Sequence, residues 1–82
     1  MSPELETLDQ LQGGDMPVAL VRRLYPSEGE YLKAVLAMIV AGEIRLAVDG
    51  ADVPHWQRFE ILRNPPPGTL LAITEKGCRR MG

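Results

Sequence analysis

The chain has 82 residues, of which 45% are hydrophobic and 24% are charged, a balance typical of a globular domain and not of a disordered segment. The formal net charge of −2 disfavours a strongly electrostatic nucleic-acid binder. The longest apolar run, residues 34–41, is too short to span a bilayer, so no membrane partner is expected. We expect one domain over residues 1–82.

Two further features bear on the compartment and the charge distribution. No basic segment precedes an apolar one at the N-terminus, so no secretory signal is evident. The single cysteine, Cys78, cannot form an internal disulfide and suits a reducing compartment, so a cytoplasmic location is expected. Acidic residues dominate residues 1–30 and basic residues dominate residues 53–82. This asymmetry predicts one mildly basic face despite the acidic pI.

Two helices are expected before residue 27. Ser2 and Pro3 are typical of a helix start, and Gly13-Gly14 ends that helix. Its apolar residues are Leu5, Leu8 and Leu11. Asp15 is predicted to cap a second helix, which Pro26 closes because a residue before proline is disfavoured in the helical region. The apolar side of this second helix comprises Val18, Leu20, Val21 and Leu24.

A third helix is predicted over residues 28–41. Ser27 and Glu30 have the spacing of a capping box, and Gly42 is a natural left-handed C-cap. The apolar face is expected to comprise Leu32, Val35, Leu36 and Ile39. The remaining sides then carry Tyr31, Lys33, Ala34, Ala37, Met38 and Ala41.

After the third helix the pattern changes to that of strands. Residues 44–48 alternate apolar and other side chains as in a half-buried strand, and Asp49-Gly50 marks its turn. Residues 51–69 are expected to form a long connection, either with a short extra strand or as an ordered loop, in which Trp56 and Phe59 are predicted to pin the segment onto the domain. Residues 70–73 are strand-like, and Thr74 is placed to cap a short final helix.

The chain resembles the winged helix-turn-helix superfamily. In that superfamily, apolar residues commonly stand ten, six and three positions before a glycine, and a branched apolar residue stands two positions after it. The matching residues here are Leu32, Leu36, Ile39, Gly42 and Ile44. The run from the second wing strand into the last helix often reads leucine-threonine-glutamate-lysine-glycine, and residues 73–77 read Ile-Thr-Glu-Lys-Gly. The resemblance implies an α+β fold with three helices, a small antiparallel β-hairpin (the wing) with a long connection at about residues 49–69, and a short C-terminal helix.

The resemblance also implies a transcriptional regulator that binds double-stranded DNA, as a dimer, with the third helix in the major groove. Residues that would then approach bases or phosphates are Arg22, Arg23, Ser27, Gly29, Tyr31, Lys33, Ala34 and Ala37. From the wing, Arg58 and Arg63 would approach the backbone or the minor groove.

A second hypothesis is a winged-helix module that binds another protein and no DNA. Its contact surface would be an exposed seam of Ala34, Ala37, Met38 and Ala41; the alternative for these small residues is that the first helix covers them. Glu28 and Glu30 would repel phosphates, although acids in a first turn also stabilise a helix through its macrodipole. The surface charge around the third helix discriminates between the two hypotheses.

No pattern of catalytic or metal-binding residues is present in the sequence. One histidine (His55) and one cysteine do not make a metal-ligand pattern, and Cys78 has no matched base. No glycine-rich phosphate loop follows a predicted strand, and no carboxylate pair indicates acid–base catalysis. We therefore expect neither an enzyme nor a cofactor.

Overall fold

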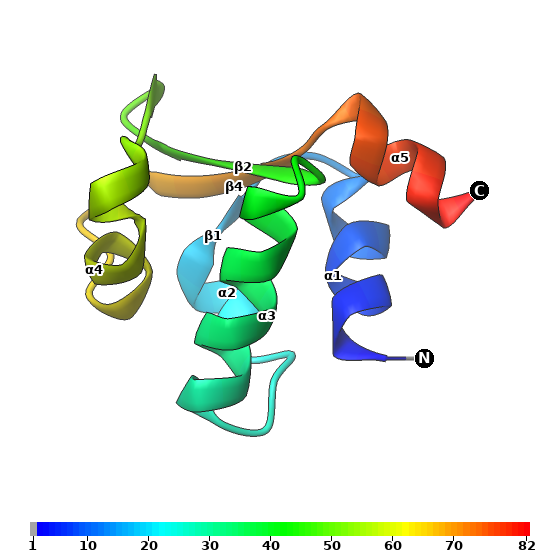
Figure 1. Cartoon of the computed structure of the whole chain (residues 1–82), viewed down its shortest axis with the longest axis horizontal. Helices are drawn as coiled ribbons and strands as arrows, with labels where there is room; N and C mark the ends of the chain where they lie inside the picture. The colour runs from blue at the N-terminus through cyan, green and yellow to red at the C-terminus, as the bar shows by residue number, and fades with distance from the viewer. Residues whose placement is uncertain (1) are drawn as a thin grey trace.

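The structure, a computed structural model, describes residues 2–82 as a small α+β domain, as predicted (Figure 1). The elements in chain order are α1 (Pro3–Leu11), β1 (Met16–Pro17), α2 (Val18–Arg22), α3 (Glu28–Val40), β2 (Ile44–Val48), β3 (Ala51–Asp52), the 3-10 helix η1 (His55–Gln57), α4 (Arg58–Arg63), β4 (Thr69–Ile73) and α5 (Glu75–Met81). Within the described residues, no helix is both long and apolar enough to cross a membrane.

The four strands form one antiparallel sheet in the order β1-β4-β2-β3. The longest pairing joins β2 to β4, from Ile44 opposite Ile73 to Val48 opposite Thr69. On its other edge, β4 pairs with β1, where Met16 lies opposite Leu71. The strand nearest the C-terminus therefore lies inside the sheet and connects residues that are far apart in the sequence.

Side chains from the helices and the sheet form one hydrophobic core. The helix α3 contributes Tyr31, Val35, Met38 and Ile39, and β4 contributes the fully buried Leu71. Thr7 and Thr69 are buried polar residues whose hydroxyls donate to backbone carbonyls, at 2.7 Å and 2.6 Å, so neither lacks a partner. In Figure 1, α3 lies between α1 and α4.

Three of the predicted helix starts are confirmed by side-chain caps. The hydroxyls of Ser2, Ser27 and Thr74 accept hydrogen bonds from the backbone N–H groups three residues later, at 3.2 Å, 3.2 Å and 3.1 Å. Gly42 has a φ of 79°, which confirms the left-handed end of the third helix. The strands predicted at residues 44–48 and 70–73 are also present, as β2 and β4.

The predicted start and end of the second helix were wrong. Asp15 does not cap it, because Met16 and Pro17 are extended and pair with β4, so α2 begins only at Val18. The helix ends at Arg22, well before Pro26, which leaves a loop of residues 23–27 before α3. Pairing with the sheet thus outweighs the local start signal at Asp15.

The core-facing side of α3 also differs from the prediction. Tyr31 and Met38, predicted outside the apolar face, are buried, whereas Leu32 and Leu36 are only partly buried. Tyr31 can be buried because its hydroxyl donates a hydrogen bond to the backbone carbonyl of Leu62 in α4. A helix that the sequence did not predict therefore supplies the partner that allows this tyrosine to be buried.

The long connection holds β3, η1 and α4, and its anchors are not the predicted ones. Val53 and Leu62 are buried, but Trp56 is 76% exposed and Phe59 is 51% exposed. The prediction that Trp56 and Phe59 pin the connection to the domain was wrong. The aliphatic residues take that role, and the two large aromatic side chains face outward.

The substitution Gly77→Ala tests how closely α5 packs on the α3–β2 turn. An added Cβ would collide with the carbonyl oxygen of Glu43, which is backbone and cannot move aside cheaply. We expect chemical denaturation to show a loss of about 1–3 kcal/mol in the free energy of unfolding. Cys78→Ala, at an exposed position of the same helix, serves as the control and should change stability little. Equal stabilities of the two variants would contradict this packing.

Candidate functional site

The outward side of α3 is the first candidate binding surface. We define the α3 surface as Gly29, Glu30, Lys33, Ala37 and Val40, all of which are exposed. They face outward because Tyr31, Val35 and Met38 occupy the buried side of the same helix. Val40, at 77% exposure, is the most exposed large apolar side chain among those described. The α3 surface thus combines small residues, one aliphatic side chain and two opposite charges.

A salt bridge alters the charge at the start of α3. The guanidinium of Arg22 lies 2.9 Å from the carboxylate of Glu28, and both side chains are partly exposed. The same guanidinium lies 5.6 Å from the centroid of the Tyr31 ring, in a cation–π position. Arg22 and Glu28 therefore neutralise each other locally, and Arg22 is not a free phosphate ligand in this conformation.

Tyr31 is a structural residue and does not lie on the α3 surface. Its side chain is 0% exposed, its hydroxyl donates to the carbonyl oxygen of Leu62 at 2.8 Å, and its ring meets Tyr25 edge-on at 6.1 Å. Burial raises the pKa of the Tyr31 phenol to about 12, although the nearby Arg22 charge acts in the opposite direction. The prediction that Tyr31 approaches DNA is therefore corrected.

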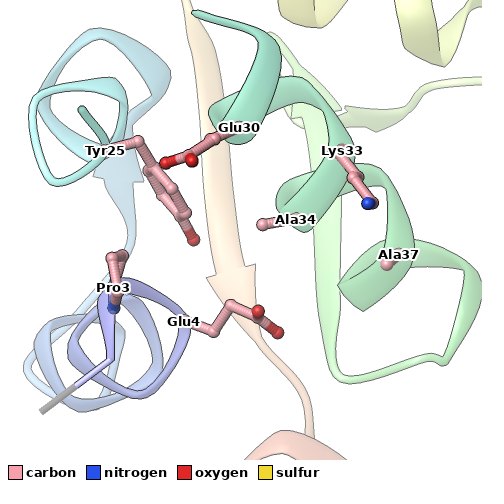
Figure 2. A pocket seen from close by; sticks show the side chains of 7 residues that line it. All are labelled: Pro3, Glu4, Tyr25, Glu30, Lys33, Ala34 and Ala37. Atoms are coloured by element: carbon pink, nitrogen blue, oxygen red, sulfur yellow. The ribbon is translucent and has the colours of Figure 1, made fainter. Parts of the chain in front are cut away.

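A cleft of about 320 Å³ lies between α1 and α3 (Figure 2). It is lined by Pro3, Glu4, Tyr25, Glu30, Lys33, Ala34 and Ala37. Figure 2 shows the Glu4 side chain extending from α1 and the Glu30 side chain from α3 into the space between the two helices. The volume is at the lower end of those that hold small ligands, and charged residues from two helices line it. The cleft shares Glu30, Lys33 and Ala37 with the α3 surface and adds Ala34.

The arginines predicted for the wing lie on α4 in different surroundings. Arg58 is half-buried and lines a hollow beside Arg45 and Asp52, whose charged groups are 3.6 Å apart. Arg63 is exposed in the last turn of α4. Together with Arg23 after α2 and Lys33 on α3, the predicted basic residues are spread over separate elements.

Several residues at these surfaces were not predicted. Glu4 and Tyr25 reach the cleft only because α1 and the loop before α3 fold against α3, and no local pattern in the sequence indicates this. Ser27 was predicted correctly as a cap, but within residues 2–82 the Glu30 carboxylate accepts no hydrogen bond from the Ser27 backbone N–H. The Glu30 side chain instead lines the cleft.

No group of three or more His, Cys, Asp or Glu side chains in the described part of the chain is arranged to hold a metal ion. No protein-family model, curated protein or solved structure matches this chain. The topology and surfaces described above are therefore the basis on which a function is proposed.

The pKa of Tyr31 predicts how stability depends on pH. Folding favours the neutral phenol, so the stability from Tyr31 is complete below its ordinary pKa of 10.0 and is lost as pH rises through about 12. In Tyr31→Phe the carbonyl of Leu62 loses its partner, and we expect about 1–3 kcal/mol lower stability at neutral pH. The variant should also show a smaller further loss between pH 10.0 and about 12 than the native chain.

Thermal unfolding followed at several alkaline pH values measures both effects. The pKa of Tyr25 is also raised by burial, so part of the alkaline loss should remain in Tyr31→Phe. If Tyr31→Phe lost as much stability at alkaline pH as the native chain, ionisation of Tyr31 would not be the cause of that loss.

Proposed function

We propose that this chain is a winged helix-turn-helix domain that binds double-stranded DNA and regulates transcription. The order α1-β1-α2-α3, followed by the antiparallel β2–β4 pair, supports this class, with α2 and α3 as the helix-turn-helix and the β2–β4 pair as the wing. The wing connection then contains β3, η1 and α4. We also propose a cytoplasmic location, where the exposed thiol of Cys78 stays reduced, and no catalytic activity.

The observation that carries the proposal is the salt bridge between Arg22 and Glu28. Acids at the start of α3 oppose an approach to phosphates, and this 2.9 Å pair neutralises one of the two, although it also removes Arg22 as a phosphate contact. Arg23 and Lys33 are exposed and form no salt bridge with another described residue. Arg23 lies in the loop before α3 and Lys33 lies on α3 itself, where Glu30 is the acid that the pair does not neutralise.

In the proposed complex, the α3 surface enters the major groove. Gly29 and Ala37 have little bulk, so the helix can approach the base edges closely. Lys33 and Arg23 contact phosphates, which sets the register of the protein on the duplex. Glutamate can accept a hydrogen bond from a cytosine amino group, a less common base contact, and Glu30 would make it in this complex.

A titration of random-sequence duplex DNA at low and moderate salt tests the proposal. Binding should weaken steeply as the salt concentration rises. Lys33→Ala and Arg23→Ala should each reduce the slope of log affinity against log salt concentration by roughly one, because each removes one phosphate contact. Glu30→Gln should strengthen non-specific binding, because it removes a negative charge and keeps the backbone N–H that Ser27 caps.

Arg79→Ala is the matched control, because it removes one exposed positive charge from α5, which lies away from the start of α3 in Figure 1. It should leave the affinity nearly unchanged. Absence of binding at low salt would refute the proposed function, and an equal effect of Arg79→Ala would refute the proposed surface.

The cleft between α1 and α3 favours a second candidate function, a module that binds another protein. Ala34 and Ala37 line this cleft, as that hypothesis requires, but Met38 is buried and cannot belong to the seam. The substitution Ala34→Gln would fill the cleft with a longer side chain without changing the charge or the five residues of the α3 surface. It should therefore weaken binding of a protein partner and leave DNA binding nearly unchanged, which separates the two candidates.

A further inference from the structure

The aromatic residues are divided unequally between the core and the surface. The chain has two tyrosines, one tryptophan and one phenylalanine. Tyr25 and Tyr31 are in the core, whereas Trp56 and Phe59 are 76% and 51% exposed within four positions of each other. Exposed aromatic side chains on a small protein favour a contact with another molecule, because their burial releases much apolar surface from water.

The segment that carries Trp56 and Phe59 is held firmly to the domain. Leu62 is 0% exposed, and its carbonyl accepts the hydrogen bond from the Tyr31 hydroxyl at 2.8 Å. Val53, just before η1, is buried as well. The two exposed aromatic side chains are therefore carried by an anchored segment that includes α4, which lies at one edge of the molecule in Figure 1.

Helical spacing places charged residues of both signs beside the aromatic pair. Phe59, Glu60 and Arg63 are exposed on the side of α4 away from the buried Leu62, and Trp56 precedes them by about one turn. We call Trp56, Phe59, Glu60 and Arg63 the α4 surface. Among residues 2–82, neither Glu60 nor Arg63 forms a salt bridge, and Glu60 accepts only a 3.2 Å hydrogen bond from Asn64.

We propose that the α4 surface binds the α4 surface of a second copy of this chain, with the two helices antiparallel about a twofold axis. The argument is charge complementarity, since the surface carries one acid and one base three residues apart and is neutral as a whole. A twofold axis near Phe59 and Glu60 brings the partner's Arg63 towards both Glu60 and Trp56, and every such contact occurs twice. An ion pair and a cation–π contact thus form around an apolar centre.

The dimer is expected to be weak. The contributing segment is short, and the area it offers is smaller than the roughly 800 Å² per partner of a standard interface. Tryptophan and arginine are nevertheless the residue types that most often dominate binding energies. We therefore expect a dissociation constant on the order of micromolar or weaker. The proposal does not depend on DNA binding, because association is measured with the protein alone.

Charge reversal on the full chain tests the proposed pairing. Sedimentation over a range of concentrations should show a monomer–dimer equilibrium, with tryptophan emission shifting to shorter wavelength as the dimer forms. Glu60→Arg and Arg63→Glu should each weaken association by roughly tenfold or more, because like charges then meet twice. Mixing the two variants should restore association, since each altered residue meets its complement in the other variant.

Arg79→Glu is the matched control, because it makes the same charge change on α5 and should associate like the native chain. Trp56→Ala should also weaken association, and circular dichroism verifies that each variant is folded. A native chain that stays monomeric at high concentration would overturn the proposal. Failure of the mixed variants to associate would equally overturn it, and that result cannot arise from misfolding when both variants are folded.

Discussion

The burial of Tyr31 is the constraint on which the candidate surfaces depend. A tyrosine in the core needs a partner for its hydroxyl, and the carbonyl of Leu62 provides it at 2.8 Å. Its ring contacts Tyr25 at one edge and lies under the guanidinium of Arg22. One side chain thus joins α3 to α4, to the end of α2 and to the loop before α3.

Each of these contacts affects a surface. Because Tyr31 turns inward, Lys33 and Ala37 turn outward and form part of the α3 surface. The position of Arg22 over the Tyr31 ring also brings it to Glu28, which changes the charge at the start of α3. The bond to Leu62 holds α4 so that Trp56 and Phe59 face outward. The two proposed interactions, with DNA and with a second copy, therefore use different sides of one packed unit.

Local signals predicted much of the secondary structure. The three side-chain caps and the glycine end of α3 depend on residues within one turn of each other, so they can be recognised without the fold. The strand β2 was recognisable from its alternating pattern. Of the candidate site residues, Lys33 and Ala37 do lie on the exposed side of α3, whereas Tyr31 does not.

The sequence by itself determined the α+β class, the ends of α3 and the main strands, because capping and alternation are interactions between near neighbours. Only the tertiary structure decided which side of α3 is buried, that α2 is short, and that the long connection contains a helix with exposed aromatic residues. Those features depend on partners far along the chain, such as Leu62 for Tyr31 and β4 for Pro17. The local pattern allowed more than one buried side for α3 and more than one start for α2. The hydrogen bond of a buried hydroxyl and the pairing of strands in the sheet determine which of them forms.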